Sequence, residues 1–210
     1  MIPIHRIDPA RALYQQMEQH LLHDAVPSAY FNHLKRNPEF RGHPFDMLYS
    51  LTGTRQSPKH HPEGSVWNHT MMVVDEAAQL KNQSGDARVF LWAALLHDIG
   101  KAPTTRIRSG KITSYDHDKA GAGLARKFLG QFSDDAAFID GVTALIRYHM
   151  HILYVDKGLP FADIRGMRAH TDVAELALLG LCDRLGRQGS DRAEEEENIR
   201  LFLQKTKAER

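Results

Sequence analysis

Apolar residues recur three and four positions apart along nearly the whole chain, a spacing that places them on one face of a helix. Residues 106–113 differ, because apolar and polar residues alternate there around a Ser-Gly pair and predict a short β-hairpin. The pattern therefore predicts an all-α bundle with this one hairpin. The expected helices cover residues 9–23, 27–35, 44–51, 66–81, 87–97, 116–129, 134–149, 161–169, 173–186 and 191–207.

Residues that commonly cap helices precede several of these segments. Ser65, Asp86 and Ser133 each stand before a predicted helix, and either Thr171 or Asp172 stands before another. A short polar side chain at this position accepts a hydrogen bond from a backbone N–H group of the first turn. The capping residues therefore support the predicted helix starts.

At 210 residues the chain is long enough for one domain with a substantial core. We expect residues 1–55 to form an N-terminal helical cap, residues 56–190 the metal-binding helical core and residues 191–210 a C-terminal helix. The longest apolar stretches are too short to span a bilayer, and the charged residues at the N-terminus are unlike those of a signal peptide. We therefore expect a cytoplasmic protein without a membrane partner.

Composition gives no sign of strong electrostatic attraction to nucleic acid. The formal net charge is +1 at pH 7 and the pI is about 8.0, so the chain lacks a strongly basic field. This composition neither excludes nor supports the binding of tRNA. The one cysteine, Cys182, excludes an internal disulfide. The sequence does not predict the oligomeric state.

Ionisable side chains project from the apolar faces of the predicted helices towards the core. Burying such groups costs free energy unless partners satisfy them, and several on different helices are difficult to satisfy one by one. Gly100 is placed to end the helix after His97 and Asp98, so that these two neighbours can converge. A shared divalent cation would satisfy imidazole and carboxylate groups together. The residues concerned are His69, His97, Asp98, His117, His149 and Asp183.

Part of this set resembles the signature of a known family. His69, the pair His97-Asp98 and Asp183, in this order, resemble the H…HD…D motif of the HD-domain metal-dependent phosphohydrolases. The resemblance implies an all-α HD-domain helical bundle. It also implies that these four residues hold a divalent metal.

The local sequence is similar to the HD region of the bacterial CCA-adding tRNA nucleotidyltransferases. The similar segments are residues 59–70, 93–102, 147–149 and 183–187, and the resemblance covers most of residues 30–190. Those enzymes also carry an N-terminal polymerase domain with a glycine-rich stretch and paired catalytic aspartates. Because this sequence shows no such element, we expect no nucleotide addition and a stand-alone hydrolase module.

The resemblance implies one divalent ion held by four ligands, His69, His97, Asp98 and Asp183. The expected ion is Mn, Fe, Co, Ni, Mg or Zn. Mixed imidazole and carboxylate ligands suit Mn, Fe, Co, Ni or Zn better than Ca. In some dinuclear HD proteins, residues that match His117 and His149 hold a second ion. We favour one ion, with His117 and His149 lining the pocket, over this two-ion alternative.

Two cationic residues are candidates for contact with phosphate. Lys101 follows the end of the predicted helix that carries His97, where its positive charge interacts favourably with the helix dipole. Its side chain is also long enough to reach a phosphate held near the metal. Arg187 lies one turn after Asp183 and is either a phosphate or base ligand or a solvated surface residue. The expected catalytic residues are Asp98, Lys101, His117 and His149, and the expected substrate-binding residues are Lys101, His117, His149 and Arg187.

Other neighbours of the motif receive lesser roles. Arg147 is a weaker phosphate candidate, because it lies off the helix face of His149. Asp118 is expected to orient the histidine before it or a water molecule. His151, two residues beyond His149, is expected to be exposed, and Glu63 lies in a loop that is expected to be structural.

The resulting hypothesis is a divalent-metal-dependent phosphohydrolase that acts on nucleotides or small phosphate esters. The resemblance to the CCA-type HD region implies 2′,3′-cyclic phosphodiesterase, nucleotidase or phosphatase activity. One alternative is a diiron HD-type oxygenase, in which His117 and His149 complete the ligand set. A second alternative is a non-catalytic module that binds tRNA or a partner, although the intact ligand set argues against it.

Overall fold

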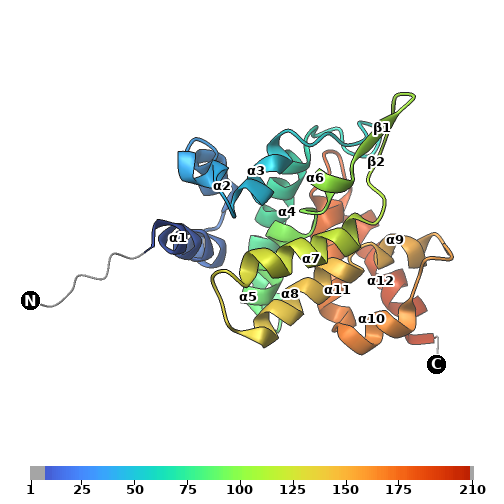
Figure 1. The fold of residues 1–210 in the computed structure, drawn as a ribbon. Helices are drawn as coiled ribbons and strands as arrows, with labels where there is room; N and C mark the ends of the chain where they lie inside the picture. The colour runs from blue at the N-terminus through green and yellow to red at the C-terminus, as the bar shows by residue number, and fades with distance from the viewer. Residues whose placement is uncertain (1–7, 209–210) are drawn as a thin grey trace, which may run out of the picture.

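The computed structural model describes residues 8–208, which form a bundle of α-helices with one small hairpin (Figure 1). The helices are α1 Pro9–His23, α2 Ser28–Leu34, α3 Asp46–Tyr49, α4 Val66–Leu80, α5 Ala87–Leu96, α6 Lys101–Thr104, α7 His117–Leu129, α8 Ala136–Tyr148, α9 His151–Asp156, α10 Ile164–His170, α11 Val173–Leu185 and α12 Arg192–Ala208. Strands β1 Arg106–Arg108 and β2 Lys111–Thr113 pair antiparallel, with Ile107 opposite Ile112. Short 3-10 helices cover Pro38–Arg41, Ser50–Thr52 and Lys81–Gln83. The predicted all-α fold and its hairpin are confirmed.

The predicted helices agree with the observed ones to within a turn at each end, but two features differ. The short helices α6 and α9 were not predicted, because each is shorter than the window over which an apolar period can be recognised. The cap of α8 is Asp135, whose side chain accepts a hydrogen bond from the backbone N–H of Phe138. The prediction of Ser133 as this cap is wrong, since its hydroxyl oxygen accepts from the backbone N–H of Asp135 instead.

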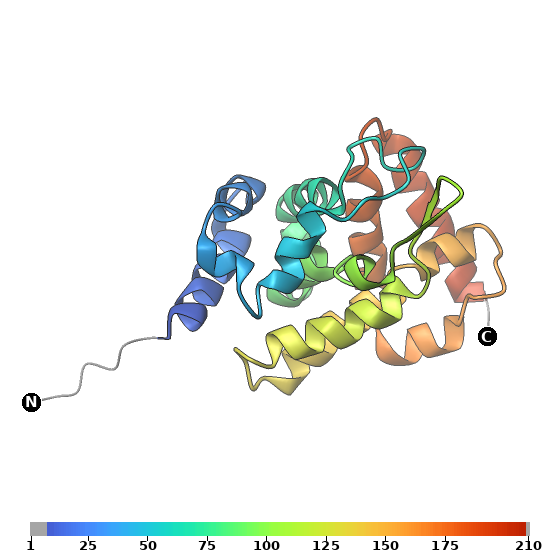
Figure 2. The same ribbon diagram turned by 45° about the horizontal axis from the view of Figure 1, so that its top comes forward.

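Helix α5 lies at the centre of the bundle, packed against α1, α4, α8 and α11. Figure 2 shows α4 and α5, in teal and green, between the blue N-terminal helices and the orange and red C-terminal ones. The side chains from Phe90 to Leu96 have no exposed surface. Burial of a large apolar side chain contributes about 1.5–3 kcal/mol to stability. The apolar run of α5 therefore anchors the residues that follow it, His97 and Asp98, inside the core.

Helices α1 and α2 are joined to the bundle by aromatic and polar contacts. Helix α1 packs against α4 and α5, and α2 packs against α4. The indole N–H of Trp92 donates to Glu18 over 2.9 Å, and that of Trp67 donates to Asn32 over 2.9 Å. The ring of Tyr14 stacks on Trp92 with 4.8 Å between the ring centroids. These contacts fix the N-terminal helices beside the helices that carry the candidate site.

No helix within residues 8–208 is both long and apolar enough to cross a membrane. The expectation about a signal peptide concerns the N-terminal residues 1–7, which lie outside the described residues. The division of the chain at residues 55 and 190 stays a prediction.

Gly100 stands where two backbones approach closely, and not in a left-handed helix cap. The sequence led us to expect that Gly100 ends the helix after Asp98, but α5 ends earlier and Gly100 has a φ of −71° just before α6. A Cβ atom at Gly100 would overlap the carbonyl oxygen of His117 and lie 2.5 Å from the backbone nitrogen of Gly121. The missing side chain therefore lets α7 pack directly on the turn that carries Asp98.

Gly100→Ala should lower the free energy of unfolding by about 3 kcal/mol or more, because the added methyl group meets rigid backbone atoms. The matched control is Gly123→Ala on α7, where a Cβ atom would meet no described atom within 4 Å. That control should stabilise the protein by about 0.5–1 kcal/mol, since alanine is the better helix former. Denaturant unfolding followed by circular dichroism measures both. Equal stability of the two variants would contradict the close approach.

Candidate metal centre

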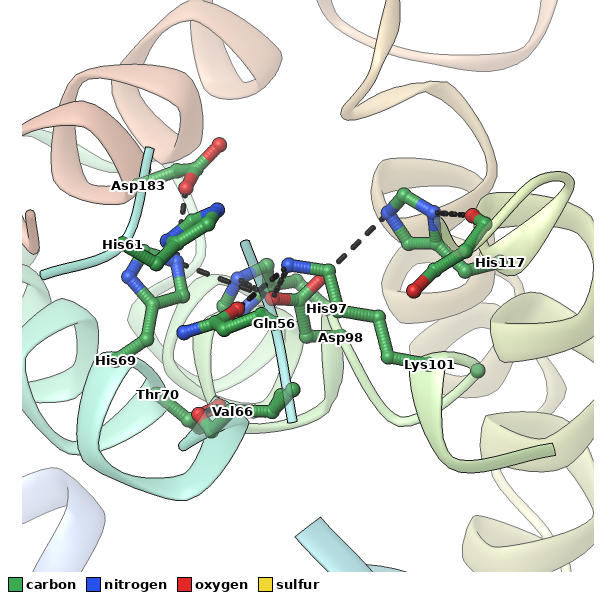
Figure 3. Close-up of polar contacts among 12 residues, drawn as sticks. Gln56, His61, Val66, His69, Thr70, His97, Asp98, Lys101, His117 and Asp183 are labelled. Atoms are coloured by element: carbon green, nitrogen blue, oxygen red, sulfur yellow. Dashed lines mark hydrogen bonds and ion pairs between the residues drawn. The ribbon is translucent and has the colours of Figure 1, made fainter. Parts of the chain in front are cut away.

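Six predicted site residues from different helices converge on one place in the core. His69 lies on α4, His97 and Asp98 follow α5, His117 begins α7, His149 follows α8 and Asp183 lies on α11. Figure 3 shows Asp98 between His69 and Asp183 on one side and His117 on the other. All are buried except Asp183, whose side chain is 17 % exposed. The helical periodicity therefore placed these side chains on the correct faces.

The carboxylate of Asp98 divides the cluster into two halves. Its Oδ2 atom lies 3.3 Å from Nε2 of His97 and 3.9 Å from Nε2 of His69. Its Oδ1 atom lies 3.5 Å from Nε2 of His117 and 3.9 Å from Nε2 of His149. The two groups of ligand-type atoms, each containing Asp98, are compact enough to surround an ion. One carboxylate thus faces two candidate cation positions.

Backbone carbonyl groups determine which nitrogen of three rings carries the proton. In His97, His117 and His149, Nδ1 lies 2.8, 2.7 and 2.6 Å from the carbonyl oxygen three residues earlier. A carbonyl oxygen only accepts, so Nδ1 donates and Nε2 of a neutral ring keeps its lone pair. Burial lowers the pKa of His149 to about 4 and also lowers that of His117, which favours the neutral rings.

The resulting lone pairs have no adequate partner within the described part of the chain. The Nε2 atoms of His117 and His149 are 3.2 Å apart, and neither has a proton to donate to the other. The buried Nε2 of His97 has no hydrogen-bond partner among residues 8–208. Two nitrogen ligands of one ion, each about 2.0–2.1 Å from it, are about 3.0–3.4 Å apart. The residues present therefore fit a divalent cation.

His69 is surrounded by acceptors. Its Nδ1 atom lies 3.1 Å from the carbonyl oxygen of Gly186 and 3.1 Å from Oε1 of Glu63, and its Nε2 atom lies 3.0 Å from Oδ1 of Asp183. Burial alone lowers the pKa of His69, but the contacts with Asp183 and Glu63 outweigh burial and raise it. A positive charge is therefore favoured at Nε2, and either a proton or a metal ion supplies it.

The two predicted phosphate-binding cations contact the carboxylates of the cluster. Nζ of Lys101 lies 2.7 Å from Oδ2 of Asp98, and a guanidinium nitrogen of Arg187 lies 3.3 Å from Oδ2 of Asp183. Burial raises the pKa of both carboxyl groups, but the neighbouring cations and histidines outweigh burial and hold each pKa well below its usual range. Gln56, which the sequence did not suggest, accepts a 3.2 Å hydrogen bond from Lys101.

Several minor expectations are changed by tertiary contacts. His151, expected to be exposed, is 1 % exposed, because α8 ends before it and α9 begins at it with a new helical phase. Asp118 pairs with Arg147 over 2.7 Å and not with the histidine before it. Glu63 accepts from Nδ1 of His61 over 2.8 Å and also faces His69, so the loop that carries it orients two rings of the site.

The cluster lies at the base of a cavity of about 780 Å³. Asp98, Lys101, His117, His149, Asp183 and Arg187 all border it. Of the six converging residues, His69 and His97 do not line the cavity, so a small molecule that enters it meets Asp98 and Asp183 of one half and His117 and His149 of the other. The structure brings every predicted catalytic and substrate-binding residue to this one cavity.

Comparison with known protein families gives a match over most of this region. Residues 66–195 match the family model described as HD domain. The match includes every one of the six converging residues, from His69 to Asp183.

Curated relatives resemble a part of the chain. It is 38% identical over 102 residues to the Multifunctional CCA protein of Halorhodospira halophila, an alignment that covers 49% of this chain and 23% of that protein. The protein of the same name from Pasteurella multocida is 34% identical over 111 residues, which cover 51% of this chain and 26% of that protein. The one from Methylococcus capsulatus is 34% identical over 128 residues, which cover 61% of this chain and 28% of that protein. The chain thus spans about a quarter of the length of these relatives.

At pH 7 we expect the rings of His117 and His149 in the metal-free protein to be neutral, with the proton on Nδ1. Because the pKa of His149 is lowered in the folded protein, the unfolded chain takes up the second ring proton more readily. The contribution of the neutral His149 ring to stability is therefore lost as the pH falls from 6.5 to about 4. Nitrogen-15 NMR of the imidazole rings, recorded across this pH range, measures tautomer and charge together. A proton on Nε2 of either neutral ring would contradict the assignment.

Proposed function

Because the chain belongs to the HD domain family, whose members are metal-dependent phosphohydrolases, we propose that it hydrolyses nucleotides or other small phosphate esters. The observation that carries the proposal is the set of buried imidazole lone pairs around Asp98, at the base of an open cavity. Imidazole nitrogens with free lone pairs beside a carboxylate form a ligand set that suits a divalent ion. An open side is what distinguishes a catalytic site from a closed structural one.

We propose His69, His97, Asp98 and Asp183 as the ligands of one divalent ion. Their mixture of nitrogen and oxygen atoms suits Mn, Fe, Co, Ni or Zn. A divalent ion there would supply Lewis acidity and a water molecule of lowered pKa. The chain's own residues orient these ligands: Glu63 and the carbonyl of Gly186 hold the ring of His69, and the carbonyl of Ala94 holds that of His97.

The other half of the cluster suits a second ion. The 3.2 Å between Nε2 of His117 and Nε2 of His149, with Oδ1 of Asp98 facing both, supports the two-ion alternative over a pocket-lining role. In that arrangement Asp98 would contribute a ligand to both positions. The same observation favours the diiron oxygenase as the second candidate function, and dependence of turnover on oxygen would distinguish it from hydrolysis.

We propose Lys101 and Arg187 as the residues that hold the phosphoryl oxygens. Each borders the cavity and lies beside a proposed metal ligand, Asp98 or Asp183. Fixed cations at this place stabilise the charge that grows on the phosphoryl group during hydrolysis. The similarity to the CCA-type HD region supports a 2′,3′-cyclic phosphodiesterase, nucleotidase or phosphatase.

Asp98→Ala should abolish metal-dependent hydrolysis of phosphate esters, with kcat lowered more than about a hundredfold, because it removes the carboxylate shared by both halves. Metal content measured by elemental analysis should fall, while the helical circular dichroism spectrum is retained. Asp134→Ala, at an exposed position before α8, is the matched control and should keep both metal and activity. Full metal content with unchanged kcat in Asp98→Ala would refute the proposal.

The number of ions is tested by His117→Ala and His149→Ala. If these rings are ligands, each variant should lose about one of two ions per chain, because a ligand set of three then drops to two. If they only line the pocket, the metal count stays constant and turnover alone falls. His33→Ala, on an exposed position of α2, controls for loss of any histidine. Metal-to-protein ratios after dialysis decide between the two arrangements.

A further inference from the structure

The cavity above Asp98 has two chemically different ends. The end beside the histidine cluster, called the inner end below, is bordered by the buried Lys101 and by Arg187, whose side chain is 36 % exposed. Its mouth is bordered by the segment after β2 and by α9 with the loop that follows, which lie on the same side of the bundle (Figures 1 and 2). The apolar side chains of this mouth are Tyr115, Leu153, Tyr154, Leu159 and Phe161. Such a division suits a substrate with a phosphate at one end and an apolar group at the other.

The side chains of the mouth are unusually exposed for their size. Tyr115 is 74 % exposed and Phe161 is 66 % exposed, and Leu153 beside them is 39 % exposed. Among residues 8–208 the other exposed large apolar side chains are Val26 and Ile107, which do not border the cavity. Exposed apolar surface gathered at one opening is characteristic of a binding site.

The charged groups of the mouth already neutralise one another. Arg147 pairs with Asp118 over 2.7 Å, and Lys119 pairs with Asp116 over 2.7 Å. At the inner end, by contrast, the carboxylates beside the cations are proposed metal ligands, so that end becomes more positive when metal binds. The mouth therefore suits a neutral group and the inner end suits the anion.

The apolar surface of the mouth is largely aromatic. Tyr154 and Phe161 form an edge-to-face pair with 5.7 Å between ring centroids, and Tyr115 comes from the separate segment between β2 and α7. Aromatic side chains bind flat rings by stacking, and removing one such contact weakens binding of a base about tenfold or more. A flat ring is therefore the neutral group that this surface fits best.

We propose that Tyr115, Tyr154 and Phe161 form a subsite for the heteroaromatic ring of a nucleobase, whose phosphate lies at the inner end of the cavity. This subsite rests on the proposed phosphohydrolase function and specifies its substrate as a nucleotide. Tyr154 is partly buried and supports Phe161, while the two exposed rings supply the faces that contact the base.

The test compares two phosphates that differ only in the base, adenosine 5′-monophosphate and ribose 5-phosphate, with the metal-loaded full chain. We expect KM for the nucleotide to be about tenfold lower than that for the sugar phosphate. The double variant Tyr115→Ala, Phe161→Ala should raise KM for the nucleotide about tenfold and leave KM for ribose 5-phosphate and the metal content unchanged. Ile107→Ala, an exposed apolar residue of the hairpin outside the cavity, is the matched control and should change neither KM.

Two variants of Phe161, one aromatic and one aliphatic, separate ring stacking from general apolar contact. Phe161→Tyr should keep the preference for the nucleotide, and Phe161→Leu should lose most of it. An equal change of KM for both substrates in the double variant would overturn the proposal. So would a stronger preference of the wild-type protein for an alkyl phosphate, such as octyl phosphate, because it would identify the occupant as an apolar chain.

Binding of adenosine and of ribose, measured by calorimetry, separates this proposal from the proposed function. If no phosphate ester is hydrolysed but adenosine binds and the double variant loses that binding, the hydrolase function is wrong and the base subsite stands. If phosphate esters are hydrolysed but adenosine binding does not depend on Tyr115 and Phe161, the subsite is wrong and the hydrolase function stands.

Discussion

The buried negative charge of Asp98 is the constraint on which the rest of the structure depends. An isolated carboxylate inside a protein costs many kcal/mol, so the surrounding chain must supply positive or polar groups on every side. Among the described residues Lys101 supplies a cation 2.7 Å from Oδ2 of Asp98. The Nε2 atoms of His97, His117 and His149 also face this carboxylate, but as lone pairs of neutral rings they need a cation between them and the carboxylate. The central helices thus gather groups that a shared cation would satisfy together.

Much of this arrangement could be predicted from local sequence. Apolar residues three and four positions from His69, His149 and Asp183 place these side chains on the inner faces of their helices, and a helical period does not depend on distant contacts. Asp86 was predicted as a cap, and Asp172 as one of two candidates with Thr171, because a capping bond is made within one turn. The family signature then added the order of the ligands along the chain.

The features that sequence reasoning missed all arise between segments. The helical phase of α8 does not continue into α9, so His151 is buried although it was expected on the surface. Arg147 contacts Asp118 on another helix, and Gly100 meets the backbone of α7, contacts that no periodicity encodes. The separation of His117 from His149 is likewise a tertiary distance, and it is the observation that supports the proposal of a second ion.

The contact between His69 and Asp183 joins residues that are 114 positions apart. An unfolded chain cannot hold these groups together, so an ion of this site would bind the folded chain alone. Such an ion stabilises the fold by about 2.7 kcal/mol when its free concentration is a hundred times its Kd. Folding and metal uptake then form one linked equilibrium. A substitution in α1, far from the cavity, would therefore lower the amount of bound metal if it destabilises the fold enough to raise the fraction of unfolded protein.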